Sequence, residues 1–375
     1  MKQERLGYYL VGWKKFANKS HALIESKKTG YELQWIFNDS TYESIDWSVP
    51  IDVPLMELYK ARALQLRQQY DYLILYFSGG ADSVNVLHAF IDNNIFIDEI
   101  LMWHCEPTES KVNNKDYSNA NYHSEIKYAA FVHLDRVKNS INPKTKITVK
   151  NYVKNGLELV RKHDNWYETM PIGLTFSISG ILRQVAQEHD TDFLRQQDTG
   201  KSTCYIMGID KPLVWNDGTD YYAYFMDTGA YHVMNPVDFN MASNDYVTTE
   251  YFYWTPDFPE IVVKQAQLLK AYYESTPSIK HMAEKSLTTH LNEYKTIIHN
   301  VIYPGYTLEP FQTEKPTTHI KRPMDQWFWD IADQRTQQNY LETIDYLGKN
   351  TNSKHMINQD VQWGIAAHRS KFYKL

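Results

Sequence analysis

Cysteine is scarce in this chain: among 375 residues, only Cys105 and Cys204 occur. Two cysteines cannot build the disulfide framework of a small secreted domain or a zinc knuckle made of CxxC pairs. The histidines, such as His88, His104 and His133, lack HExxH or other metal-ligand spacing and are more typical of polar helix positions. The sequence therefore predicts neither a disulfide scaffold nor a zinc centre.

Long apolar runs and an excess of positive charge are also missing. No apolar stretch approaches the ~18 residues of a membrane-spanning helix, and the first residues, MKQERLGYYLVGWKK, lack the apolar core of a secretory signal. The net charge is −6, from 39 Lys and Arg against 45 Asp and Glu, whereas nucleic-acid-binding proteins concentrate positive charge. We therefore expect a soluble, cytoplasmic protein without membrane contact. A small-molecule acceptor substrate is the expected partner, and nucleic acid is a possible secondary partner that the charge does not support.

The most informative segment runs from residue 71 to residue 91, DYLILYFSGGADSVNVLHAFI. Residues 72–77 form a continuous apolar run, typical of a central strand that is covered on both faces. The two glycines that follow allow positive φ and close approach of the backbone to a ligand. Val84, Leu87 and Ile91 then recur at helical spacing. The sequence therefore predicts a strand, a tight turn and a helix in direct succession.

This order of elements suits the phosphates of a nucleotide. The first amides of a helix have no partner inside it, and the helix dipole favours an anion there. A carboxylate beside phosphates needs a cation, so Asp82 predicts bound Mg²⁺. An ordinary strand-to-helix turn with Asp82 as a helix cap is the alternative. The candidate phosphate donors are the main-chain amides of Gly79, Gly80, Ala81 and Asp82 and the hydroxyls of Ser78 and Ser83.

The residues SGGADS at 78–83 match the SGGxDS signature, so the chain resembles the PP-loop superfamily, the N-type ATP pyrophosphatases. The resemblance is strong over residues 70–90 and extends in element order to residue 240, nearest to the phosphoadenosine phosphosulfate reductase branch. It implies an adenine nucleotide alpha-hydrolase-like fold, binding of ATP with Mg²⁺, and cleavage between the α- and β-phosphates. A homodimer, frequent among such enzymes, remains open. The lysine of a Walker A motif is absent, which disfavours kinase chemistry.

Strand and helix patterns alternate through the centre of the chain, which predicts an α/β fold with a mostly parallel, doubly wound sheet. Further strands are expected near residues 95–103, 146–149 and 204–207, and helices over 55–70, 119–139 and 173–189. A small N-terminal α+β unit is expected over residues 1–60, the PP-loop nucleotide-binding domain over 61–240, and a helical C-terminal extension over 241–375. In such sheets, ligands bind beyond the carboxyl ends of the strands.

Three further segments supply candidate site residues. By resemblance, Met102 and Trp103 are candidates for the adenine pocket, and a core position for Trp103 is the alternative. Lys211 is a candidate catalytic residue that neutralises the leaving pyrophosphate, or else a surface lysine before a turn. The residue before Lys211 is Asp210, at a position where the reductase branch carries arginine. Arg183, on an expected helix, is a further candidate anion contact or a solvated side chain.

Cysteine chemistry is a separate question. Cys105 and Cys204 lie near expected strand ends, and by resemblance to sulfur-transferring PP-loop enzymes they are candidates for sulfur transfer. Isolated cysteines are more often small buried hydrophobic residues. No cysteine follows Cys204, so the C-terminal cysteine motif of thiol-dependent sulfonucleotide reductases is absent.

The sequence as a whole favours an ATP-dependent adenylating enzyme that releases AMP and pyrophosphate. A substrate oxygen would be activated by adenylation for amidation, ligation or sulfur transfer. Two alternatives remain open. One is a sulfonucleotide-binding protein similar to the phosphoadenosine phosphosulfate reductases, and the other is a non-catalytic nucleotide-binding or structural protein that retains the fold.

Overall fold

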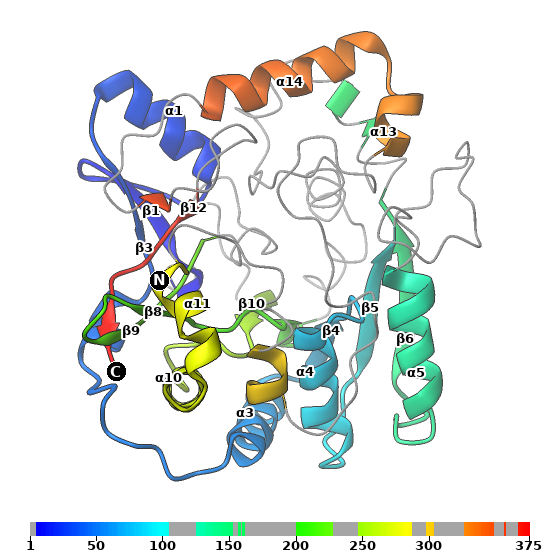
Figure 1. Cartoon of the computed structure of the whole chain (residues 1–375). Helices are drawn as coiled ribbons and strands as arrows, with labels where there is room; N and C mark the ends of the chain where they lie inside the picture. The colour runs from blue at the N-terminus through cyan, green and yellow to red at the C-terminus, as the bar shows by residue number, and fades with distance from the viewer. Residues whose placement is uncertain are drawn as a thin grey trace.

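The centre of the fold is a five-stranded parallel sheet with strand order β10-β7-β4-β5-β6 (Figure 1). Its strands are β4 (Tyr72–Tyr76), β5 (Glu99–His104), β6 (Lys146–Asn151), β7 (Thr203–Met207) and β10 (Val247–Tyr251). The computed structural model describes residues 5–104, 125–152, 157–158, 160–161, 200–227, 247–286, 298–303, 326–348, 356–357 and 367–375. The predicted α/β fold with a parallel sheet is confirmed.

The order of the strands changes direction at β4. The chain passes from β4 to β5 and then to β6 on one side, whereas β7 pairs with the other side of β4 and β10 lies beyond it. The boundary between β4 and β7 is therefore the topological switch point of the sheet. Open α/β sheets bind ligands beyond the carboxyl ends of the strands at such a point.

The central strand is apolar throughout because both of its faces are buried. In β4, Leu73 and Leu75 belong to the main core. Ile74, between them, packs with Leu101 and Tyr205 in a second cluster on the opposite face. This burial explains why residues 72–77 show a continuous apolar run instead of the alternation of a half-exposed strand.

Helices α3 (Leu55–Gln69), α4 (Ala81–Ile91), α5 (Phe131–Val137) and α10 (Glu260–Ser275) lie in a row below the sheet in Figure 1. α3 packs against both α4 and α10. The helix expected over 119–139 is described from residue 125 onward, where it begins as the π-helix η2 (Glu125–Ala130) and continues as α5. The helix expected over 173–189 lies outside the described residues.

The N-terminal residues form a small α+β unit, as predicted. Strands β1 (Tyr8–Val11), β2 (Lys14–Phe16) and β3 (Leu33–Ile36) build an antiparallel sheet in the order β2-β1-β3. Helix α1 (Lys19–Thr29) begins where the Asn18 side chain accepts a hydrogen bond from the Ser20 amide, and it ends at Gly30 in the left-handed conformation. The short helix α2 (Asp39–Glu43) follows.

The C-terminal third contains the expected helices together with strands that the sequence pattern did not indicate. The helices are α10, η5 (Pro277–Ile279), α11 (Lys280–Glu284), α13 (Gln326–Ile331) and α14 (Gln334–Gly348). β13 (Tyr373–Lys374) pairs with β9 (Tyr221–Tyr224), which pairs with β8 (Leu213–Asn216); β11 (Met356–Ile357) pairs with β12 (Ala367–His368). β11 to β13 have two residues each, too few to show a periodic pattern. The pairing of β13 with β9 therefore depends on tertiary contacts and not on a local sequence pattern.

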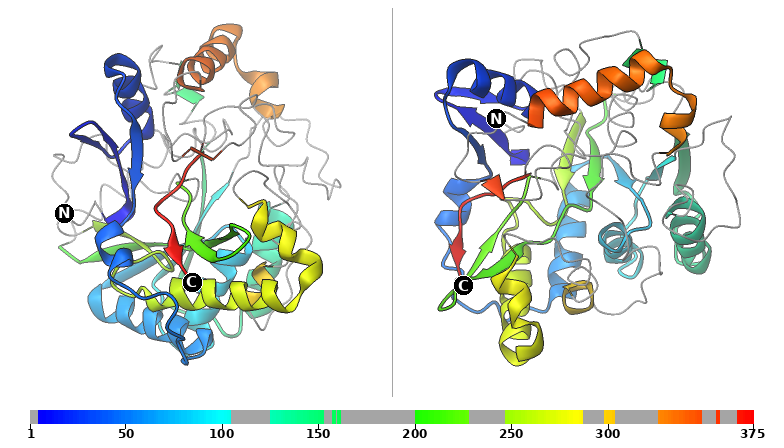
Figure 2. Two further views of the ribbon diagram at one scale, coloured as in Figure 1. Left: turned by 60° about the vertical axis from the view of Figure 1, so that its left-hand side comes forward. Right: turned by 45° about the horizontal axis from the view of Figure 1, so that its top comes forward.

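Aromatic packing joins the N-terminal unit, β9 and the C-terminus. Phe225 lies at ring-centroid distances of 5.1 Å from both Phe37 and Trp254, and Trp47 stacks on Tyr373 at 4.9 Å. Both views of Figure 2 show the C-terminal segment (red) running close to the green β9 strand. These aromatic side chains therefore form one part of the core that three distant segments of the chain share.

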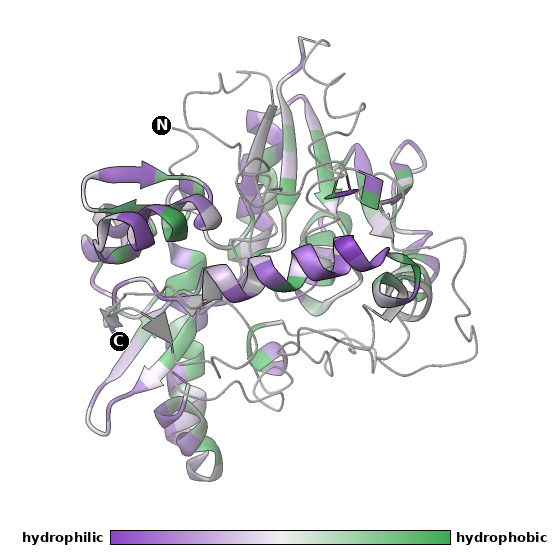
Figure 3. Cartoon of the chain, turned by 90° about the horizontal axis from the view of Figure 1, so that it is seen from above, coloured by the Kyte–Doolittle hydropathy of each residue, from purple (hydrophilic) through white to green (hydrophobic). Residues whose placement is uncertain are grey.

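The upper side of the molecule in Figure 1 carries α14. Figure 3 shows that the visible side of this helix is mostly hydrophilic. α14 contacts α1, where the Lys27 ammonium lies 3.7 Å from the ring centroid of Tyr346. Among the helices of the described residues, none is both long and apolar enough to cross a membrane.

Candidate functional site

The loop at residues 78–83 lies at the carboxyl end of β4, beside the switch point. It turns from strand to helix because Gly79 adopts a positive φ of 76°, a conformation that other residues adopt only with strain. The Ser83 hydroxyl donates to the Gly80 carbonyl at 3.0 Å and accepts from the Ser78 amide at 3.3 Å. The two serines therefore fix the turn, in addition to their predicted role as phosphate donors.

The first turn of α4 has no side-chain cap. Gly80 is the N-cap residue and has no side chain to offer. Among the described residues, no hydrogen bond is made by the main-chain amides of Asp82 and Ser83, the second and third residues of the helix. An uncapped N-terminus presents unpaired N–H groups and the positive end of the helix dipole. The N-terminus of α4 therefore has the features on which the predicted anion site depends, and the anion itself stays a prediction.

Two other chain segments approach the loop closely. A Cβ atom on Gly79 would lie 2.5 Å from the amide nitrogen of Ala130, at the end of η2. A Cβ atom on Gly208, just after β7, would lie 3.1 Å from the Ser83 nitrogen. Gly79 therefore leaves no room for a Cβ atom without a shift of the backbone, whereas Gly208 leaves little room. The ends of β4, η2 and β7 converge on the start of α4.

Lys211 contributes a buried positive charge to this position. Its Nζ atom lies 3.1 Å from both carboxylate oxygens of Asp82 and 2.7 Å from Oδ1 of Asp210. Burial alone would lower the pKa of Lys211, but Asp210 and Asp82 outweigh it and raise this pKa well above its ordinary value. Lys211 therefore carries its charge at any physiological pH, and the structure brings two sequence-predicted residues, Asp82 and Lys211, into direct contact.

The sequence did not indicate the aromatic residues that surround Asp82. The Tyr303 hydroxyl donates to Asp82 Oδ1 at 2.6 Å, and the Tyr253 hydroxyl donates to the Asp82 carbonyl at 2.9 Å. His299 stacks on Tyr303 and places Nε2 3.9 Å from Asp82 Oδ1. Burial, followed by the Asp82 charge, raises the pKa of Tyr303 well above its usual range, so the phenol remains a hydrogen-bond donor. The side chain and the main chain of Asp82 therefore each accept a hydrogen bond from a tyrosine.

The two residues proposed for the adenine pocket lie on opposite faces of β5. Met102 is completely buried in the main core. Trp103 is half-buried on the other face, where the Lys150 ammonium lies 5.7 Å from its ring centroid. The indole nitrogen of Trp103 is buried and makes no hydrogen bond among the described residues. Trp103, but not the Met102 side chain, is therefore placed beside an outer surface of the sheet.

The remaining sequence candidates are a buried thiol and residues outside the described part of the chain. Cys204 lies within β7 and is completely buried. Burial, followed by the nearby Glu250 charge, raises the pKa of this thiol well above its usual range. A protonated, inaccessible thiol is a poor nucleophile. Cys105 and Arg183 lie outside the described residues.

The described side chains around Asp82 offer few ligands to the predicted Mg²⁺. Within the described residues, no group of three or more His, Cys, Asp or Glu side chains is arranged to hold a metal ion. Asp82 and Asp210 face each other across the Lys211 ammonium, so their carboxylates already share one cation. Mg²⁺ is typically held by one or two carboxylates plus phosphate oxygens and water. Asp82 and Asp210 could therefore both bind Mg²⁺ only if the Lys211 ammonium moved away from them.

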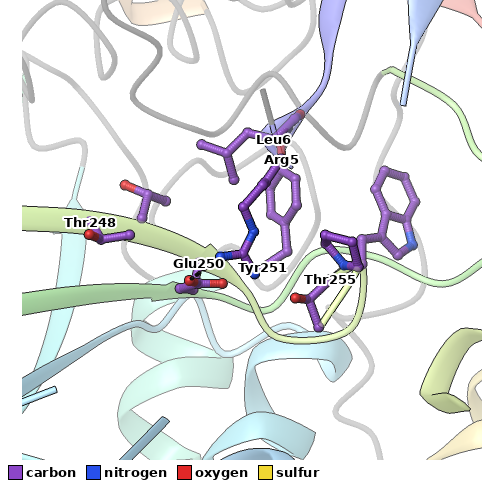
Figure 4. Close-up of a pocket in the computed structure, with 9 residues that line it drawn as sticks. Arg5, Leu6, Thr248, Glu250, Tyr251 and Thr255 are labelled. Atoms are coloured by element: carbon purple, nitrogen blue, oxygen red, sulfur yellow. Dashed lines mark hydrogen bonds and ion pairs between the residues drawn. The ribbon is translucent and has the colours of Figure 1, made fainter. Parts of the chain in front are cut away.

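A separate pocket lies at the free edge of β10 (Figure 4). Its charges are paired within the protein: Arg5 lies 3.7 Å from Glu250 and also contacts Asp257, and the buried Arg62 lies 3.1 Å from Glu250. The Tyr251 hydroxyl donates to the Leu6 carbonyl at 3.1 Å and closes one wall. These contacts therefore join the N-terminal unit to the sheet, and among the described residues that line the pocket each charged side chain has an ion-pair partner.

Comparison with known proteins does not assign the chain to a family. No model of a known protein family matches the chain, and no curated protein matches it significantly.

Proposed function

We propose that the protein is an ATP-dependent adenylating enzyme of the PP-loop type. The observation that carries the proposal is the uncapped N-terminus of α4, which lies at the switch point of a parallel sheet beside the buried ammonium of Lys211. Unpaired amides, a helix dipole and a fixed positive charge at one position suit the polyphosphate of a nucleotide. The SGGADS sequence favours ATP as that nucleotide.

In the proposed reaction, an oxygen of the acceptor substrate attacks the α-phosphorus of ATP. The bond from the α-phosphorus to its bridging oxygen breaks, and the electron pair leaves with pyrophosphate. Lys211, together with the Asp82 and Ser83 amides, offsets the charge that accumulates on pyrophosphate. Mg²⁺, when bound by Asp82 and Asp210, would supply further neutralisation of phosphate charge. A nitrogen or sulfur nucleophile then displaces AMP from the adenylated substrate.

The test is product analysis with ATP, Mg²⁺ and a panel of carboxylate and carbonyl acceptors. Formation of AMP and pyrophosphate in equal amounts supports the proposal, and formation of ADP contradicts it. Asp82→Asn should fold normally and lose this turnover. Asp135→Asn on α5, whose side chain is 75% exposed, is a matched control and should keep it. Equal turnover in Asp82→Asn and the parent protein would remove the role assigned to Asp82.

One observation favours a second candidate, a nucleotide-binding protein without turnover. Both oxygens of Asp82 are already occupied by Lys211, and Oδ1 also accepts from Tyr303. A carboxylate held in this way is not open to a metal ion until Lys211 moves. Calorimetry with ATP distinguishes the candidates, because tight binding without AMP formation across the acceptor panel supports the non-catalytic one. Preferential binding of adenosine 5′-phosphosulfate over ATP would instead indicate a sulfonucleotide ligand.

A further inference from the structure

Two histidines that are far apart in sequence meet between α4 and α5. His88 lies in the last turn of α4 and His133 lies on α5, 45 residues later. Their Nε2 atoms are 3.1 Å apart, and the two rings stand at 74° to each other. His133 is buried, whereas the His88 side chain is 16% exposed. The pair is therefore reachable from the surface on one side.

A carboxylate orients the first of these rings. Asp92, the C-cap residue of α4, lies with Oδ2 2.9 Å from His88 Nδ1. When Nδ1 carries the proton and donates it to Asp92, the Nε2 atom of His88 directs a lone pair toward His133. Carboxylate–histidine pairs of this kind commonly support metal-ligating imidazoles, where they fix the tautomer and raise the basicity of the ligand.

The spacing of the two nitrogens fits a shared metal ion. Zn–N bonds of about 2.05 Å place two imidazole nitrogens about 3.4 Å apart at a tetrahedral angle and about 2.9 Å apart at a right angle. The observed 3.1 Å lies between these values. We propose that His88 and His133 bind a divalent transition-metal ion of the Zn²⁺ type through their Nε2 atoms, with water completing the coordination.

The protons and charges around the pair are compatible with this assignment. When His88 donates Nδ1–H to Asp92, the proton between the two rings lies on Nε2 of His133. Metal binding therefore requires His133 to carry its proton on Nδ1 instead, which makes its Nε2 atom a ligand. Asp92, 49% exposed, supplies a negative charge that offsets Arg136 when a cation binds. Without metal, one Nε2–H···Nε2 hydrogen bond occupies the same space.

Metal binding at this position would clamp the two helices that support the loop at residues 78–83. α4 begins at the end of this loop, and α5 directly follows Ala130, which packs against Gly79. A cross-link between these helices should stabilise the folded protein by RT ln(1 + c/Kd), where c is the free Zn²⁺ concentration, a gain that rises with the logarithm of the metal concentration. The site does not depend on the proposed adenylating activity.

Calorimetric titration of Zn²⁺ into chelator-treated protein, with thermal unfolding in parallel, tests the site. We expect one Zn²⁺ site in the parent protein that is lost in His133→Gln, together with the Zn²⁺-dependent rise in Tm. Asp92→Asn changes an exposed side chain and should weaken Zn²⁺ binding about 10- to 100-fold without loss of folding. His281→Gln alters an exposed histidine and serves as the control.

Cu²⁺ in the same protein gives a direct view of the ligands. In the electron paramagnetic resonance spectrum of the parent protein, the Cu²⁺ electron spin should couple to two imidazole nitrogens. In His88→Gln it should couple to at most one. Equal Zn²⁺ affinity in the parent protein, Asp92→Asn and His133→Gln would overturn the proposal and leave a hydrogen bond only. Absence of Zn²⁺ binding by the parent protein at neutral pH would do the same.

Discussion

The Nζ atom of Lys211 lies 3.1 Å from each carboxylate oxygen of Asp82, across 129 residues of sequence. This contact joins the loop after β7 to the first turn of α4, on both sides of the switch point. The same ammonium lies 2.7 Å from Asp210. The two carboxylates therefore share one buried ammonium, and a polyphosphate bound there as we propose would compete with them for it.

Replacement of this ammonium should weaken nucleotide binding. Because a charge-assisted hydrogen bond contributes about 1.5–3 kcal/mol, we expect Lys211→Met to raise the Kd for ATP roughly 10- to 100-fold, as measured by calorimetry. Lys60→Met on α3 removes the same charge from an exposed side chain and serves as the control. If both variants bind ATP as tightly as the parent protein, Lys211 does not contact the phosphates.

The strand, turn and helix of residues 72–91 and the parallel sheet are the parts that the sequence predicts best. Residues 72–91 are local: an apolar strand, a turn with two glycines and an amphipathic helix each depend on neighbours in sequence. The resemblance also pointed to Lys211, and the structure places its ammonium in contact with Asp82. The carboxyl ends of parallel strands meet at one edge, so residues at those ends were expected to converge.

The parts that the sequence missed depend on contacts between distant segments. Tyr303 reaches Asp82 from 221 residues away, and no motif surrounds it. β10 carries the mixed sequence VTTEY, which neither alternates nor forms an apolar run, because it is an edge strand. Likewise, His88 and His133 show no metal-ligand spacing along the chain, although their side chains meet in space.

The close approach of Ala130 makes Gly79 sensitive to substitution. Gly79→Ala combines strain from the φ of 76° with a Cβ that would lie 2.5 Å from the Ala130 nitrogen. Gly30→Ala is a matched control, since its φ of 72° is similar and nothing lies within 4 Å of the added atom. We expect the control to cost about 1–2 kcal/mol of unfolding free energy, and Gly79→Ala to cost clearly more and to reduce ATP binding. Urea unfolding measures both, and equal losses would contradict the packing argument.

The hydroxyl of Tyr303 should stabilise the fold through Asp82. Tyr303→Phe removes the bond of 2.6 Å to Asp82 Oδ1, and hydrogen bonds to charged groups contribute about 1.5–3 kcal/mol. Tyr251→Phe is the comparison, because the Tyr251 hydroxyl donates to the neutral carbonyl of Leu6 at 3.1 Å. We expect a smaller loss there, about 1 kcal/mol. A loss in Tyr303→Phe no greater than in Tyr251→Phe would show that Asp82 does not depend on this donor.

A buried ion pair should make stability depend on acid pH. The completely buried Asp227 accepts hydrogen bonds from Lys19 Nζ at 2.6 Å, from Tyr9 at 3.0 Å and from the His368 amide at 2.9 Å. Burial alone would raise the pKa of Asp227, but Lys19 and His368 lower it to about 2, against 3.8 ordinarily. The unfolded chain therefore binds this proton at higher pH than the folded protein does. The stabilisation is complete above pH 4 and is lost as the pH falls toward 2.

Urea unfolding between pH 5 and pH 2 measures this dependence. Asp227→Asn leaves Lys19 buried without a carboxylate, and removal of one partner of a buried pair costs about 3–5 kcal/mol at neutral pH. The variant should also show a shallower loss of stability below pH 4 than the parent protein. Tyr9→Phe is the milder variant and should lose about 1.5–3 kcal/mol, while Asp52→Asn, at an exposed position, should match the parent protein. If Asp227→Asn keeps the full slope between pH 4 and pH 2, other carboxylates account for the acid sensitivity, and the Lys19–Asp227 pair does not.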